Sequence, residues 1–266
     1  MTGYVHGYSS TETRRLADQA DALAGRLHAG AVFAPGSRVL EVGCGVGAQT
    51  VHLARNNPAC AITSVDLSAR SIAEARRRVA ARGLENVTFL QADLDELPFG
   101  PASFDHLFIC FVLEHLREPA AALRRLARQL VPGGTLTVVE GDHDSFFCHP
   151  TGPAVDAAVA ALVELQRRAG GDATIGRRLH PLLVEAGYSS VAVEPLPIYA
   201  DPSRPELASG FTRATFRAMV AGVEAEALAA GLVSPAAWTE ALRLLGEAAD
   251  RGTAFYAFLR GTAVRG

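Results

Sequence analysis

The sequence predicts an α/β fold: a doubly wound, mostly parallel seven-stranded sheet with helices on both faces and added helical lid segments. Short runs rich in Val, Ile, Leu and Phe recur along the chain, as is typical of parallel strands that are buried on both faces. Segments with helical spacing lie between these runs, and Gly or Pro marks most of the boundaries. Strands that alternate with helices in this way favour a doubly wound sheet.

The expected elements begin with an N-terminal arm and helix at 1–33, which we interpret as a lid, and the sheet domain follows at 34–266. A capping-box pattern, in which Glu12 follows Ser9 by three positions, predicts where the first helix begins. The expected strands are 38–42, 61–65, 87–91, 106–110, 135–139, 191–199 and 253–264. The expected helices are 47–55, 68–82, 119–130, 154–169 and 177–185, with two or three more between 205 and 250. Gly83 can end the second of these helices, because glycine supplies a left-handed cap.

We expect a single domain with helical insertions near 145–175 and 203–250. The sequence shows no internal repeat and no low-complexity linker that would divide it. A separate C-terminal domain is the alternative, although the last expected strand needs a sheet to join.

Composition excludes several kinds of chemistry. The 266 residues carry 25 basic and 28 acidic side chains, and every basic one is Arg. Without Lys there is no Schiff-base chemistry and no phosphate-binding P-loop. A net charge of −3 argues against a nucleic-acid partner. The four Cys lie far apart, so we expect reduced thiols in a cytoplasmic protein, with no metal site. We also expect no signal peptide and no membrane span.

The sharpest motif follows the first expected strand and contains Glu41, Gly43, Cys44, Gly45 and Gly47. Glycines at a strand-to-helix turn let backbone N–H groups and the helix N-terminus approach a ligand closely. Dinucleotide-binding folds use G-x-G-x-x-G, but this turn reads G-x-G-x-G and follows a carboxylate. That carboxylate would repel a pyrophosphate and would suit a ligand with a cationic amino acid end and a sulfonium.

The motif resembles that of the class I S-adenosylmethionine-dependent methyltransferases, whose first motif reads E/D-x-G-x-G-x-G. The resemblance implies S-adenosyl-L-methionine as cofactor, S-adenosyl-L-homocysteine as product, and contacts from all five residues of the turn. Asp66 ends the second expected strand, where a carboxylate can accept hydrogen bonds from both ribose hydroxyls. Ser68 can cap the next helix in its place, and Leu67 would lie against the adenine.

The end of the third expected strand carries Ala92, Asp93 and Leu94. It resembles the family segment whose acidic side chain accepts from the adenine amino group, so the resemblance implies this role for Asp93. The neighbouring acidic residues Asp95 and Glu96 are interpreted as solvated.

The end of the fourth expected strand carries Cys110 and Phe111, followed by Leu113. The resemblance places a backbone carbonyl of Cys110 or Phe111 at the methionine amino group, and Leu113 near the ligand. The family motifs together cover about residues 36–142.

Candidate acceptor-binding residues lie in two segments. Tyr4, His6 and Tyr8 alternate in the N-terminal arm, so an extended chain would present them on one side, with Tyr8 a candidate catalytic residue. After the fifth expected strand, Glu140, His143 and Phe147 are candidate substrate contacts. His143 is the candidate general base, and a structural histidine is the alternative.

We therefore expect methyl transfer to a small aromatic acceptor of secondary metabolism. A looser resemblance, carried by the arm, the segment Glu140–His143 and residues 176–183, is to methyltransferases that act on indole C3 in tryptophan-derived cyclic dipeptides. The alternatives are an O- or N-methyltransferase, an NAD(P)-dependent oxidoreductase, and a non-catalytic cofactor-binding subunit. The common reductase base Tyr-x-x-x-Lys is absent, because there is no Lys. The oligomeric state, including a homodimer, stays open.

Overall fold

The computed structural model describes residues 23–266. The predicted acceptor contacts Tyr4, His6 and Tyr8 lie outside the described residues, as does most of the predicted lid at 1–33.

The described chain contains one seven-stranded sheet with strand order β3-β2-β1-β4-β5-β7-β6. Its strands are β1 (Arg38–Val42), β2 (Ala61–Asp66), β3 (Val87–Gln91), β4 (Phe104–Cys110), β5 (Leu130–His149), β6 (Tyr188–Ala200) and β7 (Thr253–Arg265). The pairs β1/β2, β2/β3, β1/β4 and β4/β5 are parallel. The order reverses at β1, which extends one way through β2 and the other way through β4, so the predicted doubly wound fold is confirmed.

The described residues form two compact units, which we treat separately. The sheet unit comprises Ala24–Glu140, Gly176–Glu194 and Leu259–Gly266, and the helical unit comprises Gly141–Ile175 and Pro195–Phe258. Strands β5, β6 and β7 each contribute residues to both units. The predicted insertions near 145–175 and 203–250 fall in the helical unit.

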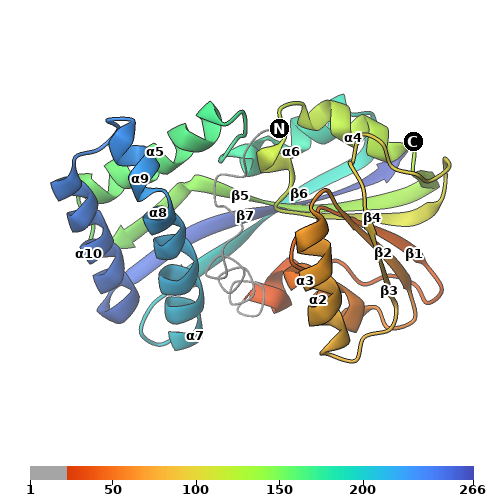
Figure 1. The fold of residues 1–266 in the computed structure, drawn as a ribbon, viewed down its shortest axis with the longest axis horizontal. Coiled ribbons are helices and arrows are strands. Elements are labelled where there is room, and N and C mark those ends of the chain that lie inside the picture. The colour runs from red at the N-terminus through yellow and green to blue at the C-terminus, as the bar shows by residue number, and fades with distance from the viewer. Residues whose placement is uncertain (1–22) are drawn as a thin grey trace. The chain divides into compact units, whose positions relative to one another are not determined.

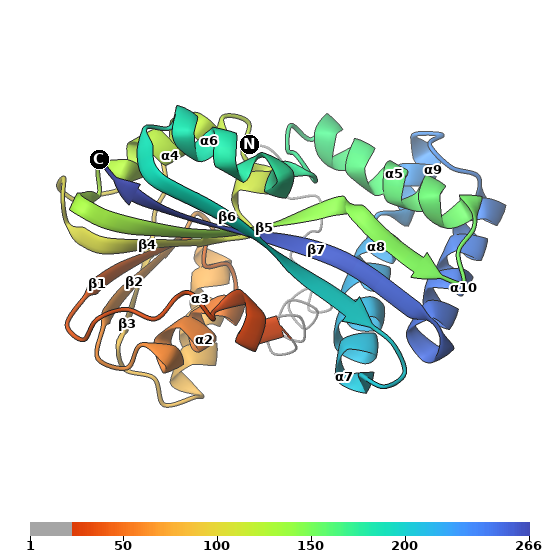
Figure 2. The same ribbon diagram turned by 180° about the vertical axis from the view of Figure 1, so that it is seen from behind.

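The sheet unit has helices on both faces of its strands. Helices α2 (Ala48–Asn56) and α3 (Ala69–Ala80) cover one face, and α4 (Pro119–Ala127) and α6 (Leu179–Glu185) cover the other (Figures 1 and 2). Strands β1 and β4 at the centre of this sheet are buried almost throughout, which explains their continuous apolar runs. This packing fixes the strand ends from which the candidate site is built.

The helical unit has helices of its own. They are α5 (Pro153–Arg168), α7 (Pro205–Leu207), the π-helix η3 (Ala208–Arg217), α8 (Ala218–Gly222), α9 (Glu224–Ala229) and α10 (Pro235–Arg251). Helix α10 packs against α5 and η3 and buries Trp238 completely. Aromatic side chains from η3 and β7 meet in this unit: the Tyr256 ring lies 5.2 Å from that of Phe211 and 4.7 Å from that of Phe258.

Two predicted elements had wrong bounds in the region of β5. The helix expected at 119–130 ends at Ala127, and the strand expected at 135–139 runs from Leu130 to His149. The segment Pro132-Gly133-Gly134, whose residues are typical of a turn, is accommodated within the strand as an irregularity. Phe104 of β4 pairs with Leu130, whereas His106 pairs with Thr135, so β5 holds extra residues between these pairs.

Candidate functional site

The glycine turn after β1 is tied to the end of β2 by its backbone. The N–H groups of Gly43 and Cys44 both donate to the carbonyl oxygen of Val65, at 2.8 and 3.0 Å. Gly43 has φ +69°, and a Cβ on it would lie 2.5 Å from a methyl carbon of Val112. Glycine is therefore required there, because the loop after β4 packs directly onto the turn.

Gly45 differs from the other motif glycines, because nothing lies within 4 Å of the position a Cβ would take. Its φ is +52°. At Gly47, by contrast, a Cβ would lie 2.9 Å from Ala75 of α3, so that glycine lets two helices approach. Gly45 thus leaves open space at the tip of the turn, where a ligand could reach the backbone.

Asp66 holds the tip of this turn in place. Its Oδ2 accepts from the Gly45 N–H at 2.8 Å, and its Oδ1 accepts from the Ser68 N–H at 2.8 Å. Burial raises the pKa of Asp66, and the two backbone N–H groups oppose the rise. Each carboxylate oxygen keeps a further acceptor site, which is what a ribose diol needs. Ser68 caps α3 by accepting from the Ser71 N–H at 3.2 Å, so the expectation that Ser68 supplies the cap is confirmed.

The neighbouring residues at the ends of β2 and β3 are open to a ligand. Leu67 is 64% exposed, which leaves its apolar face available for a base. The Ala92 N–H donates to the Asp66 carbonyl oxygen at 3.0 Å, which joins the two strand ends. Asp93 is exposed and accepts from the Asp95 N–H at 2.9 Å, and Leu94 is half-buried. Contacts from these residues to adenine stay predictions.

Glu41 lies beneath the turn with its side chain buried. Its Oε2 accepts from the Ser64 hydroxyl at 2.6 Å. Burial raises the pKa of Glu41 to about 7. A direct contact between Glu41 and a cationic ligand group stays a prediction.

The loop after β4 completes this edge of the sheet unit. Cys110 is buried, and burial raises the pKa of its thiol well above the ordinary range. Phe111 has φ +60°, a left-handed conformation that is uncommon for a bulky residue and that clusters at functional sites. Leu113 is buried, and its N–H donates to Glu140 Oε1 at 2.7 Å. The loops after β1, β2 and β4 thus meet at the carboxyl ends of parallel strands, where such folds bind ligands.

Of the other predicted acceptor residues, Glu140 lies in the sheet unit, and His143 and Phe147 lie in the helical unit. His143 is buried, and its Nδ1 lies 2.9 Å from the Tyr256 hydroxyl. The backbone N–H of His143 donates to the Ala173 carbonyl oxygen at 2.9 Å. Phe147 is 56% exposed and stacks on Phe255, with ring centroids 4.8 Å apart. The alternation in 253–264 puts Tyr256 on the buried side of β7.

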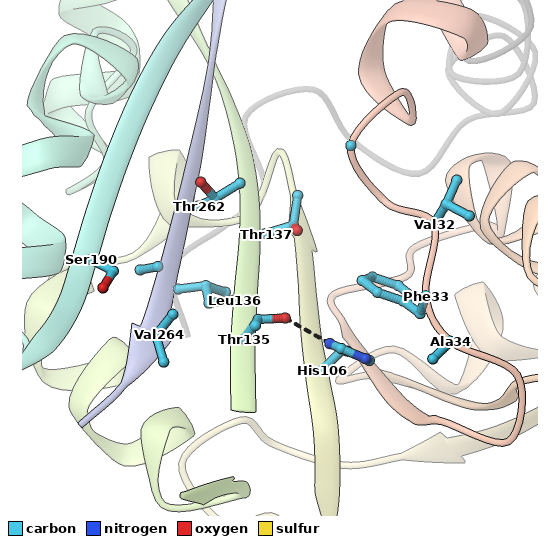
Figure 3. A pocket seen from close by; sticks show the side chains of 12 residues that line it. Val32, Phe33, Ala34, His106, Thr135, Leu136, Thr137, Ser190, Thr262 and Val264 are labelled. Atoms are coloured by element: carbon cyan, nitrogen blue, oxygen red, sulfur yellow. Dashed lines mark hydrogen bonds between the residues drawn. The ribbon is translucent and has the colours of Figure 1, made fainter. Parts of the chain in front are cut away.

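A pocket of about 400 Å³ lies elsewhere in the sheet unit, towards the amino ends of β1 and β4 (Figure 3). In it, His106 Nδ1 lies 2.6 Å from the Thr135 hydroxyl, and Phe33 stacks on the His106 ring at 4.2 Å. None of the predicted site residues within 23–266 lines this pocket.

No helix within 23–266 has the length and apolarity to cross a bilayer. Within the same residues, no three His, Cys, Asp or Glu side chains are grouped so that they could hold a metal ion.

Comparisons with known proteins show which family the residues of this site resemble. Residues 39–134 match the family described as "Methyltransferase domain". This segment of the chain is therefore similar to a methyltransferase domain. The matched segment includes the glycine turn, Asp66, Asp93 and the loop after β4.

Three relatives illustrate the range of similarity. An uncharacterized 37.1 kDa protein in transposon TN4556 of Streptomyces fradiae is 31% identical over 190 residues, which are 71% of this chain and 54% of that protein. The 27-O-demethylrifamycin SV methyltransferase of Amycolatopsis mediterranei is 28% identical over 208 residues, 77% of this chain and 74% of that enzyme. The structure of Haemonchus contortus phosphoethanolamine N-methyltransferase 2 with phosphomonomethylethanolamine and S-adenosylhomocysteine has TM-score 0.56 and 22% identity. That match covers 92% of this chain and 52% of that protein. The chain spans about half the length of the first and third of these.

Proposed function

We propose that the protein transfers a methyl group from S-adenosyl-L-methionine to a small-molecule acceptor. The observation that carries this proposal is the arrangement of Gly45 and Asp66: an open glycine tip beside a carboxylate that two backbone N–H groups hold in place. The match to a methyltransferase family over the same residues supports it.

The donor's sulfonium is already activated, so the protein's part is to bind, orient and exclude water from the two reactants. Asp66 would orient the ribose, and the exposed Leu67 would contact the adenine. Cys110, Phe111 and Leu113 would border the amino acid end of the donor. None of these roles requires a metal ion.

The acceptor is proposed to be aromatic, with indole C3 of a tryptophan-derived cyclic dipeptide as the specific candidate. An electron-rich ring carbon attacks with its π electrons and needs no strong base, whereas an oxygen or nitrogen acceptor can need one. His143 is the proposed base for the latter case, and the Tyr256 hydroxyl at its Nδ1 would fix the tautomer of the ring. The A. mediterranei relative, 27-O-demethylrifamycin SV methyltransferase, supports a small-molecule acceptor without identifying it.

The decisive experiment has a binding arm and a product arm. In calorimetry, the protein is expected to bind S-adenosylhomocysteine but not NADP; binding of NADP alone would indicate the oxidoreductase alternative. Incubation with S-adenosylmethionine and a panel of indoles, phenols and amines should then give a product heavier by one methyl group in mass spectrometry. Donor binding without turnover of any acceptor would favour the non-catalytic subunit.

Substitution of Asp66 tests the residue assignment. Asp66→Ala should weaken S-adenosylhomocysteine binding about tenfold to a hundredfold, because charged hydrogen bonds to the ribose are lost. Asp105→Ala is the matched control: Asp105 also accepts a backbone N–H, from Arg38 at 2.8 Å, but it lies at the amino end of β4. Equal affinities of the two variants would contradict the role of Asp66.

A further inference from the structure

The side chain of Glu140 connects β5 to the loop after β4 within the sheet unit. It lies at the end of that unit's part of β5, and its side chain is completely buried. Its Oε1 accepts from the N–H groups of Val112 and Leu113, at 3.0 and 2.7 Å. These donors lie where the short 3₁₀ helix η1 (Leu113–His115) begins, and the first N–H groups of a helix have no partner within it. One carboxyl oxygen of β5 therefore anchors the loop after β4.

That loop borders the glycine turn and needs an anchor. It starts at Phe111, whose left-handed backbone (φ +60°) costs conformational energy that the surroundings must offset. The next side chain, Val112, occupies the space that any Cβ on Gly43 would need. The position of Val112 therefore sets one wall of the space around the turn, and the Glu140 hydrogen bonds set the position of Val112.

The charge state of Glu140 suits a structural anchor. Burial and the nearby Glu114 carboxyl raise the pKa of Glu140 well above the ordinary range, which favours the neutral acid. The carboxyl groups of Glu140, Glu41 and Glu114 all raise the pKa of the buried Cys110 thiol, so these three groups lie in one region of the sheet unit. Glu140 Oε2 is buried and has no hydrogen-bond partner among residues 23–266. A neutral carboxyl group resembles an amide in shape and can accept the same two N–H bonds.

We propose that Glu140 is a positioning residue of the methyl-donor site: it fixes the loop after β4 so that Val112 lies against Gly43 and the donor pocket keeps its binding shape. This assignment rests on the proposed function, because the loop matters only when the donor binds beside the glycine turn. It differs from the role predicted from the sequence, in which Glu140 contacts the acceptor.

Two substitutions test the anchor. Glu140→Ala removes the acceptor oxygen and should weaken S-adenosylhomocysteine binding at least about tenfold in calorimetry, at a temperature where the variant is folded. Glu140→Gln keeps an oxygen that can accept both N–H bonds, so its affinity should stay within about threefold of the wild type. Hydrogen exchange at the Val112 and Leu113 amides should accelerate in Glu140→Ala and not in Glu140→Gln. If Glu140→Ala does not fold, Glu140→Asp, whose carboxyl group is withdrawn by one methylene, replaces it with the same expected loss.

Asn57→Ala separates positioning from general loss of stability. Asn57 is also buried and holds backbone groups through its amide, with Nδ2 2.8 Å from the Ala31 oxygen and Oδ1 2.8 Å from the Phe33 nitrogen. Asn57 lies at the opposite end of α2 from the glycine turn. The Asn57→Ala substitution should therefore lower the melting temperature and leave the affinity for S-adenosylhomocysteine unchanged. If Glu140→Ala binds as tightly as Asn57→Ala, Glu140 is no positioning residue. Failure of the wild type to bind S-adenosylhomocysteine would instead contradict the proposed function.

Discussion

At the scale of single residues, His28 shows how burial connects pH to stability. Its ring stacks on Phe108 with centroids 5.2 Å apart, and its Nε2 lies 2.7 Å from Gln49 Oε1. Burial lowers the pKa of His28 to about 4. Because the folded-state pKa lies below the ordinary 6.5, protonation favours the unfolded chain. The contribution of neutral His28 is therefore complete above pH 6.5 and is lost as the pH falls through 4. A shift of this size corresponds to at most about 3 kcal/mol.

The resulting prediction compares two histidine substitutions. His28→Gln should flatten the fall in the free energy of unfolding between pH 6.5 and 4, because the titrating ring is gone. His180→Gln, at an exposed position on α6, should leave that fall unchanged. Urea unfolding across this pH range measures both. If the free energy of unfolding of His28→Gln falls with pH as steeply as that of the wild type, another group is responsible for the fall.

At the scale of elements, β5 marks the limit of what local sequence can predict. The strands β1 to β4 were predictable because each is a short run rich in Val, Ile, Leu or Phe. The length of β5 was not, because Pro132-Gly133-Gly134 is typical of a turn. Whether such a segment is a turn or a strand irregularity depends on the pairing of His106 with Thr135, which residues 130–134 do not encode. Gly134 makes the irregularity possible, since a Cβ there would lie 2.9 Å from the Val131 oxygen and 3.0 Å from the Asp105 oxygen.

Gly134→Ala should therefore destabilise the protein by about 1–3 kcal/mol, since the neighbouring atoms are backbone and cannot move aside easily. The control is Gly100→Ala, where the nearest atom to a Cβ is the Ser103 Oγ at 4.0 Å. That substitution should change the free energy of unfolding by no more than about 0.5 kcal/mol. Denaturant unfolding of both variants is the measurement. Equal stabilities would mean that β5 relaxes around the added methyl group.

At the scale of the whole molecule, the residues of the candidate site fall into two groups. Some belong to local sequence motifs, and others are brought together from distant positions in the chain. The glycine turn, Asp66 and the strand ends around them were predictable, because each motif is local and its order along the chain gives its place at the sheet edge. The pairing of His143 with Tyr256 and the contact of Glu140 with Leu113 join residues 113 and 27 positions apart. Only the folded chain brings these groups together, so no local pattern could have revealed them.

The place where the methyl donor binds can be tested along the whole described chain. Hydrogen–deuterium exchange with saturating S-adenosylhomocysteine should slow at 43–47, 66–68 and 110–113, because a ligand there shields N–H groups and restrains the loops. Peptides from the pocket near His106, at 30–34, 135–137 and 262–264, should be unaffected, since that pocket lies towards the opposite end of the strands. The Asp66→Ala variant, at the same ligand concentration, should lose the protection at 43–47. Protection confined to the His106 pocket would move the donor site to the amino ends of the strands and overturn the assignment of the glycine turn.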